Sequence, residues 1–175
     1  LKVMSVDLGR SYVHSGRAVE GARLIEETLQ RGNAEIQVYA GDWQTSLAEA
    51  YLLAGRLDEA RTAAAKALDL SRTLGQRGAE AECLRLLGEI ACSGGASELE
   101  AAGRYCEEAM ARAEELGMRP LVARCHLGLG EIARRSGEKA PARQHLDAAA
   151  SLFREMDIDF WREKAEAEAR VVASS

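Results

Sequence analysis

The sequence predicts an all-α protein made of stacked helical hairpins, and three observations lead to this prediction. Hydrophobic residues make up 47% of the 175 residues and many of them are alanine, whereas only 2 prolines and 5% aromatic residues occur. Alanine, leucine, glutamate and arginine are common in this chain and favour helices. A leucine followed by a small residue recurs at regular intervals, and a glycine follows each small residue seven positions later. This arrangement is typical of a repeated helix–turn–helix unit.

The internal repeat is clearest in the second half of the chain, where Leu87–Ala91 returns as Leu129–Ala133. A second helix follows each turn and carries its own small residue, and the third copy needs two extra residues near 96–100 to align. Because one hairpin cannot bury both of its faces, we expect the hairpins to stack. The small residues are Gly9, Ala48, Gly88 and Gly130 in the first helices and Gly21, Ala60, Ala102 and Ala142 in the second helices.

The small residues and the turn glycines each have a physical role. A small residue in the first helix lets a neighbouring helix approach closely, and the small residue in the second helix receives a large side chain from the first. Gly16, Gly55 and Gly137 lie where the first helix must end. Glycine adopts the left-handed conformation at a helix end without a Cβ clash, so these positions predict turns.

We expect nine helices, of which the last is a capping helix. Pro120 and Pro141 fall near two predicted helix starts, where the missing N–H costs little. The last helix is charged except for one apolar stripe, as in a helix that packs on one side only. The stripe consists of Trp161, Ala165, Ala169 and Val172. The expected helices span about 2–14, 17–31, 36–54, 57–74, 77–93, 98–117, 119–136, 139–156 and 158–172.

The first helix has no matching cap, so its apolar residues are expected to face a preceding repeat or a partner. A chain that starts without methionine, inside a helical pattern, is expected to be part of a longer protein. The apolar residues of this N-terminal edge are Leu1, Val3, Met4, Val6 and Leu8.

The pattern of a Leu-Gly pair, a tyrosine three residues on and a glycine four residues later resembles the tetratricopeptide repeat. The resemblance covers about Val3 to Phe153. It implies a right-handed α-α superhelix of stacked hairpins, with 1–175 forming a single array. The implied repeats span about 1–33, 34–75, 76–117 and 118–157, followed by a capping helix at 158–173.

The chain also departs from the tetratricopeptide pattern. No proline ends each repeat, and the repeats are longer than the usual 34 residues or so because their helices are longer. Such long repeats resemble the C-terminal tails of bacterial regulators that carry a signalling ATPase or a nucleotide cyclase in front. The family's first large aromatic residue is replaced by Ser5, Gln44, Leu84 and His126.

Charge, cysteine spacing and motif context argue against several other function classes. The net charge of -5 argues against nucleic acid as a partner, and no apolar run is long enough to span a membrane. No cysteine pair has the C-x-x-C spacing, which favours a reduced, cytoplasmic protein. The glycines of a G-x-G-x-x-A match at 128–133 fall in mid-helix, where they cannot bind a nucleotide. The three histidines show no ligand spacing, so we expect no catalytic residue, metal or cofactor.

The family resemblance implies that the first helices of the repeats line a concave groove. Two interpretations of its charges stay open: they pair with one another between neighbouring helices, or they form a mixed-charge trough for a peptide. Val6 and Arg10 replace the lysine and asparagine that clamp a peptide carboxylate, so a chaperone tail is not the expected ligand. The predicted groove residues are Arg10, His14, Glu49, Leu52, Leu53, Arg85, Glu89, Arg124, Leu127, Glu131, Arg134 and Arg135.

These observations together predict a non-catalytic protein-interaction or scaffolding module. We expect the C-terminal sensory or regulatory part of a larger bacterial signalling protein, which binds a protein or peptide, or its own upstream catalytic domain, in the groove. The alternative is a self-association module that forms a homodimer through its uncapped N-terminal edge.

Overall fold

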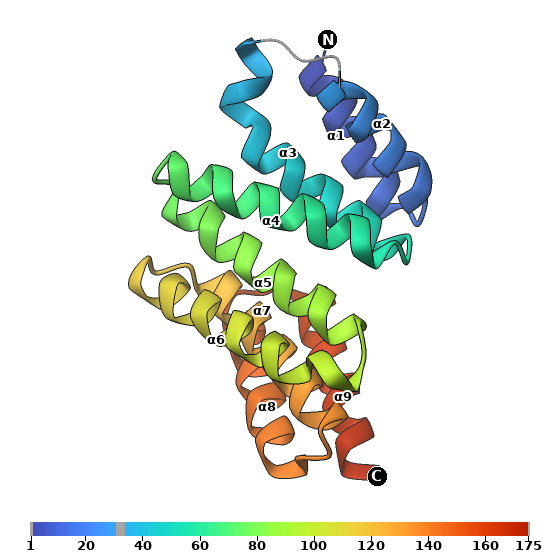
Figure 1. The fold of residues 1–175 in the computed structure, drawn as a ribbon. Helices are drawn as coiled ribbons and strands as arrows, with labels where there is room; N and C mark the ends of the chain where they lie inside the picture. Colours follow the sequence, from blue (N-terminus) through green and yellow to red (C-terminus); the bar gives the residue numbers. More distant parts are fainter. Residues whose placement is uncertain (1, 31–33, 175) are drawn as a thin grey trace. The chain divides into compact units, whose positions relative to one another are not determined.

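The computed structural model describes residues 2–30 and 34–174, with side chains for 6–13, 15–30 and 40–174, and helices dominate it (Figure 1). The predicted all-α class is confirmed, and each described helix end lies within two residues of the expected one. A short 3-10 helix, η1 (Ala96–Glu98), holds the two extra residues of the third repeat. The α-helices are α1 Lys2–His14, α2 Ala18–Gln30, α3 Ala34–Leu53, α4 Leu57–Thr73, α5 Arg77–Ser93, α6 Leu99–Glu115, α7 Arg119–Arg135, α8 Lys139–Glu155 and α9 Asp159–Ser174.

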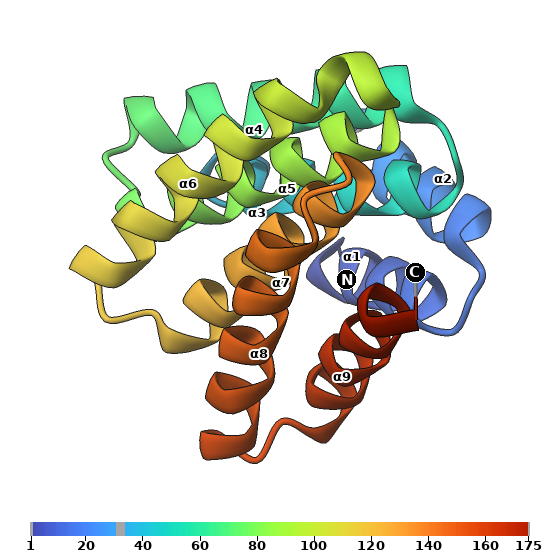
Figure 2. The same cartoon turned by 90° about the horizontal axis from the view of Figure 1, so that it is seen from below.

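The chain divides into two compact units, an N-terminal unit of residues 1–86 and a C-terminal unit of residues 87–175. The N-terminal unit contains the α1–α2 and α3–α4 hairpins, and the C-terminal unit contains α6, the α7–α8 hairpin and α9; the division falls inside α5. Figures 1 and 2 show the paired helices of each hairpin side by side. The single array over 1–175 stays a prediction. None of the described helices is long and apolar enough to cross a membrane.

The predicted turn glycines have the expected backbone conformation. Gly16, Gly55 and Gly137 have φ values of +82°, +74° and +81°, in the left-handed region. The N–H of the next residue donates to a carbonyl five residues back, which is the closing hydrogen bond of a Schellman motif. These bonds join Arg17 N to Tyr12 O, Arg56 N to Tyr51 O and Glu138 N to Ala133 O, at 2.8, 2.9 and 2.9 Å.

The small residues Gly9, Gly88 and Gly130 of three first helices lie against the second helices of their own hairpins, which confirms the predicted close approach at these three positions. A Cβ added at Gly130 would lie 2.6 Å from Leu146 Cγ and 3.3 Å from the carbonyl oxygen of Ala142. The same construction at Gly88 would lie 2.5 Å from Cys106 Sγ. No real Cβ tolerates such distances, so these positions require glycine at the observed helix separation.

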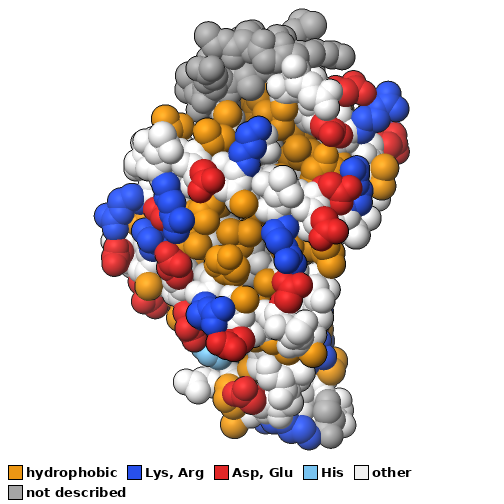
Figure 3. All heavy atoms as spheres, in the orientation of Figure 1, with side chains coloured by type: hydrophobic (Ala, Val, Ile, Leu, Met, Phe, Trp, Pro, Cys, Tyr) orange, Lys and Arg blue, Asp and Glu red, His pale blue; other side chains and the backbone are white. Residues whose placement is uncertain are grey.

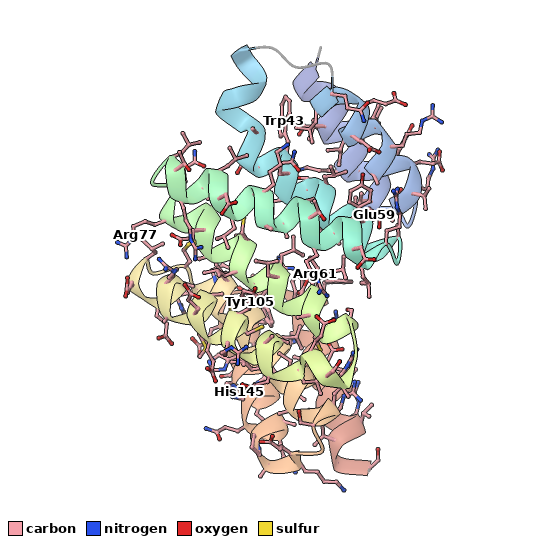
Figure 4. The ribbon with its side chains drawn as sticks, in the orientation of Figure 1. Trp43, Glu59, Arg61, Arg77, Tyr105 and His145 are labelled. Atoms are coloured by element: carbon pink, nitrogen blue, oxygen red, sulfur yellow. The ribbon has the colours of Figure 1, made fainter. Side chains whose placement is uncertain are left out.

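The hydrophobic core of the C-terminal unit includes the predicted capping helix. Phe153 of α8 is 1% exposed, and its ring stacks on Trp161 of α9 with 6.3 Å between ring centroids. The predicted apolar stripe of α9 lies in this cluster, with Ala165 and Val172 buried and Trp161 and Ala169 partly buried. In the N-terminal unit a large aromatic residue of the core is Trp43 of α3, which is 4% exposed (Figure 4).

Candidate functional site

The predicted groove residues of the C-terminal unit engage one another and α9. Arg124 of α7 forms an ion pair with Glu89 of α5 at 3.7 Å, and its guanidinium lies 4.8 Å from the ring centroid of Trp161. Arg134 forms an ion pair with Glu168 of α9 at 3.1 Å. Two arginines of the α7 groove face therefore contact the capping helix.

Arg135 makes two contacts of a different kind. Its Nη2 lies 2.6 Å from Glu131 Oε1, one helical turn earlier, and its Nη1 donates a 2.7 Å hydrogen bond to the carbonyl oxygen of Cys92. Cys92 lies at the end of α5, where carbonyls have no partner within the helix and carry the negative end of the helix dipole. Arg135 therefore ties α7 to the C-terminus of α5.

These contacts match the interpretation in which groove charges pair between neighbouring helices. The pairs are half-exposed, and such pairs contribute only about 0–1 kcal/mol each. A ligand that brings its own charges could exchange with them at low cost. Leu127, by contrast, is 6% exposed and lies in the core cluster with Phe153.

The predicted groove residues of the N-terminal unit are more varied. Arg10 of α1 donates a 2.6 Å hydrogen bond from Nε to Ser46 Oγ of α3. Arg85 is buried and forms an ion pair with Glu82 at 3.1 Å. Glu49 and Leu52 are half-buried and Leu53 is exposed, and the side chain of His14 lies outside the described residues.

Two hollows in the N-terminal unit recur one repeat apart, a feature that the sequence reasoning missed. The first hollow, of about 300 Å³, lies between α1 and α2, and the second hollow, of about 340 Å³, lies between α3 and α4. Every residue that lines the first has a counterpart 39 positions later in the second. The pairs are Leu8 and Leu47, Tyr12 and Tyr51, Glu20 and Glu59, Arg23 and Thr62, Leu24 and Ala63, and Glu27 and Lys66.

The tyrosine of each hollow lies under an arginine. The Arg17 guanidinium is 4.0 Å from the Tyr12 ring centroid, and the Arg56 guanidinium is 4.5 Å from that of Tyr51. Each arginine also forms an ion pair with the glutamate at the start of its hairpin's second helix, such as Glu59 (Figure 4). Burial, and then the nearby Glu26 carboxylate, raises the pKa of Tyr51, so its hydroxyl stays protonated and donates.

The α7–α8 hairpin has two histidines at the corresponding place. His126 and His145 stand 82 residues after Gln44 and Ala63, which line the second hollow. Their Nδ1 atoms are 2.9 Å apart, and their ring centroids are 5.2 Å apart. The repeat register alone could have paired these two residues, because it places both on the facing sides of one hairpin.

The four thiols have a packing role. Cys83, Cys92, Cys106 and Cys125 are all buried. Burial raises the pKa of the Cys83 and Cys92 thiols, so they stay protonated and are poor nucleophiles. In the described part of the chain, no group of three or more histidine, cysteine, aspartate and glutamate side chains could hold a metal ion.

No protein-family model matches the chain, and neither does any curated protein. Several solved structures are similar to it. One is aspartyl phosphate phosphatase F from Bacillus subtilis, with a TM-score of 0.81 and 15% identity over 99% of this chain and 45% of that chain. Another is a Rap protein complexed with competence and sporulation factor, with a TM-score of 0.84 and 17% identity over 94% of this chain and 46% of that chain.

The apo form of RapI is also similar, with a TM-score of 0.78 and 14% identity over 99% of this chain and 63% of that chain. The chain thus spans less than two thirds of each of these three structures. At such identities the likeness shows the fold, an all-α superhelical repeat of tetratricopeptide-like hairpins, which agrees with the fold class that the sequence predicts.

Proposed function

We propose that this chain is a non-catalytic interaction module that binds a peptide or a protein segment on the groove face of its first helices. We propose further that it is the sensory or regulatory part of a larger bacterial signalling protein in the cytoplasm. The partner is then a separate molecule or a catalytic domain of the same protein. The solved structure of a Rap protein with competence and sporulation factor supports this proposal, because it combines this fold with a bound factor.

The observation that carries the proposal is the mixed-charge face of α7. Arg124, Arg134 and Arg135 lie on it in half-exposed ion pairs, with side-chain exposures of 21%, 31% and 38%. Figure 3, in which α6 lies in front of α7, shows acidic and basic side chains among hydrophobic ones on this other side as well. Arginine presents a planar fork of donors that suits peptide carboxylates and carbonyls, and exchange of one carboxylate for another changes little in free energy.

A peptide library displayed on phage and selected on the intact chain tests this proposal. The best peptide is then titrated calorimetrically against the chain and against the double variant Glu89→Lys with Glu131→Lys. Because the two lysines remove the carboxylates that compete with the peptide for Arg124 and Arg135, we expect the double variant to bind the peptide more tightly by about tenfold or more, which corresponds to about 1.4 kcal/mol.

The matched control is the double variant Glu100→Lys with Glu108→Lys on α6. These glutamates form i,i+4 ion pairs with Arg104 and Arg112, as Glu131 does with Arg135, but they lie on a second helix, whereas the groove is proposed on the first helices. Peptide binding should be unchanged in the control. Failure to select any peptide, or equal affinity for both variants and the parent chain, would count against binding at the groove.

The alternative, self-association through the N-terminal edge, has its own support in the first hollow. Leu8 and Val19 beside it are 46% and 63% exposed. The corresponding surface of the α3–α4 hairpin, which includes Tyr51, faces α2, because the Tyr51 side chain forms a hydrogen bond with Glu26 of α2. A surface built to receive another hairpin is therefore open at α1 and α2.

Sedimentation velocity over a range of concentrations tests this alternative. If the alternative holds, the chain dimerises and the double variant Leu8→Glu with Val19→Glu is monomeric. Leu53→Glu, which changes an equally exposed leucine at the end of α3, is the control and should leave the dimer intact. A sedimentation coefficient that corresponds to a monomer at every concentration rules self-association out.

A further inference from the structure

The second hollow, between α3 and α4, contains a buried amide that its surroundings do not satisfy. Gln44 of α3 lines the hollow and is only 7% exposed. Among the described residues, its side-chain amide has no hydrogen-bond partner. A buried amide without a partner is unfavourable, because it has lost hydrogen bonds to water and gained none. Gln44 can therefore offer one acceptor and two donors to a molecule that enters the hollow.

The α7–α8 hairpin shows how the corresponding position is satisfied elsewhere in the chain. His126 corresponds to Gln44, and its Nδ1 lies 2.9 Å from Nδ1 of His145 on the second helix. The residue that corresponds to His145 is Ala63, which is 5% exposed and has no polar atom in its side chain. The second helix of the α3–α4 hairpin thus supplies no polar group at this position, and a bound molecule can supply one.

A comparison of the two hollows indicates the charge of that molecule. Leu24 and Glu27 line the first hollow where Ala63 and Lys66 line the second, and the second hollow is the larger, at about 340 Å³ against about 300 Å³. Lys66 is exposed, so its ammonium group is open to a ligand from solvent. A carboxylate is attracted by Lys66, whereas Glu27 would repel it. The second hollow therefore suits an anion and the first does not.

The other lining residues leave this end of the hollow suited to an apolar ring with a carboxylate. Leu47 of α3 is 6% exposed and lines the hollow, so it offers apolar surface. Asp58 and Glu59 also line the hollow, but Asp58 precedes Lys66 by about 12 Å along α4. Glu59 is already paired with Arg56 at 2.9 Å. The acidic groups therefore lie toward the turn, and the lysine lies at the other end.

We propose that the second hollow binds a small planar carboxylate that carries a lactam or carboxamide group. The amide edge of the ligand pairs with Gln44, donor to acceptor and acceptor to donor, as glutamine pairs with an adenine edge. The ligand carboxylate meets Lys66, and the ring packs on Leu47. None of the predicted groove residues lines this hollow, so the site is separate from the proposed peptide site. The bound ligand contacts both helices and stabilises the α3–α4 hairpin.

Calorimetric titrations of the intact chain with orotate, uracil and benzoate test the site. Orotate has lactam groups and a carboxylate on one flat ring, whereas uracil lacks the carboxylate and benzoate lacks the lactam. We expect one orotate per chain. The affinities for uracil and for benzoate should be lower by about tenfold or more, because each molecule lacks one of the two polar contacts. Orotate should also raise the melting temperature of the chain.

Variants of the lining residues assign the binding to the second hollow. Gln44→Leu and Lys66→Gln should each weaken orotate binding by about tenfold or more. Ala63→Leu, which copies the first hollow, should abolish binding because the larger side chain fills the space. Arg61→Gln is the matched control, since Arg61 is an exposed basic residue of α4 that does not line the hollow (Figure 4). This variant should bind orotate like the parent chain.

Nuclear Overhauser contacts of orotate with the parent chain are a second test that does not depend on folding of the variants. We expect the carbon-bound proton of the orotate ring to lie close to the methyl groups of Ala63 and Leu47. Contacts with Leu8 and Leu24 of the first hollow instead overturn the proposal. So does a chain that does not bind orotate, and so do equal affinities for orotate, uracil and benzoate or an equal loss of binding in Arg61→Gln.

Discussion

The α3–α4 hairpin and the α7–α8 hairpin are built on the same skeleton with different contents. Both have a buried small residue in the first helix and a glycine at the turn, and their second helices, α4 and α8, correspond in sequence with a constant offset of 82 residues. Between the helices, Gln44 and Ala63 line the second hollow, whereas His126 and His145 at the corresponding positions make a nitrogen–nitrogen contact.

The ends of the second helices differ in the same way. Ser71 of α4 and Phe153 of α8 are corresponding residues and both are buried, but one is small and polar and the other is a large aromatic. Gly75 and Asp157 correspond as well, and both adopt a left-handed conformation. The comparison teaches that the small residues at the helix contact and the left-handed residues at the turns define the hairpin. The positions around them differ between the two hairpins and can serve either core packing or binding.

Replacement of Phe153 by alanine should have the largest effect. The ring is 1% exposed and stacks on Trp161, so Phe153→Ala leaves a cavity in the core of the C-terminal unit and should cost about 3–5 kcal/mol. Ser71→Ala, the corresponding change in α4, removes a 2.9 Å hydrogen bond from Ser71 Oγ to the carbonyl oxygen of Ala67 and should cost about 1 kcal/mol. Urea unfolding of both variants measures the difference in the free energy of unfolding. Equal losses would mean that Phe153 and Ser71 contribute equally to the packing of their hairpins.

Overpacking at the helix contact should have the next largest effect. Gly130→Leu places a side chain where even a Cβ would lie 2.6 Å from Leu146 Cγ, and should cost about 1–3 kcal/mol. Gly103→Ala in α6 is the control, because an added Cβ there meets no atom within 4 Å. That change should be neutral or stabilising, since alanine favours a helix interior by about 0.5–1 kcal/mol. Thermal melts that show no loss for Gly130→Leu would contradict the repeat register.

The histidine contact should make the α7–α8 hairpin sensitive to acid, unlike the α3–α4 hairpin. The pKa values of His126 and His145 are lowered from 6.5 in the folded chain, mainly by burial, against the opposing carboxylates of Glu114 and Glu107. The unfolded chain therefore binds more protons as the pH falls below about 6.5, and the free energy of unfolding decreases by at most about 1.4 kcal/mol per pH unit for each histidine. The contribution of the two neutral histidines to the free energy of unfolding is fully present above that pH.

Melting temperatures measured from neutral to mildly acidic pH check this prediction. His145→Ala, which copies Ala63 of the α3–α4 hairpin, should flatten the dependence on pH. His14→Gln serves as the control and should keep the slope of the parent chain. A slope that is the same in His145→Ala and in the parent chain would show that the acid sensitivity has another origin.

An exchange between the two helix ends should have the smallest effect. Asp157 has a φ of 56°, which a residue with a Cβ adopts at a cost, whereas Gly75 has a φ of 64° at the corresponding position. Asp157→Gly should therefore stabilise the chain by about 1 kcal/mol, and Gly75→Asp should destabilise it by a similar amount. Chemical denaturation of the two variants should give shifts of opposite sign, and shifts of one sign would contradict the equivalence of the two turns.

The helices and turns could be predicted from the sequence because their causes are local. Helix-forming residues, the recurrence of Leu-small pairs and the turn glycines act within one hairpin, so the expected range 77–93 coincides with α5. The stripe of α9 was predicted for the same reason, since its apolar residues repeat at helical spacing. The helix containing Leu99 was expected one residue too early, because the 3-10 helix η1 takes up the start of that segment.

The candidate site was predicted less completely, because it depends on which helices meet. The family resemblance marked Arg134 and Arg135 for the groove, but their partners, Glu168 of α9 and the carbonyl oxygen of Cys92, lie 34 and 43 positions away in the sequence. The contact of His126 with His145 was missed for the same reason, although the repeat register contained the signal. Peptide binding and the single array stay predictions.

The sequence by itself determined the fold class, the hairpin unit and its turns, because each follows from the propensity and the size of neighbouring residues. Only the tertiary structure decided that groove arginines pair with α5 and α9, that two hollows recur in the N-terminal unit, and that two histidines meet between α7 and α8. Side-chain contacts between helices depend on rotamers and helix separation, and a periodic pattern encodes the facing sides of helices but not the distances between their atoms.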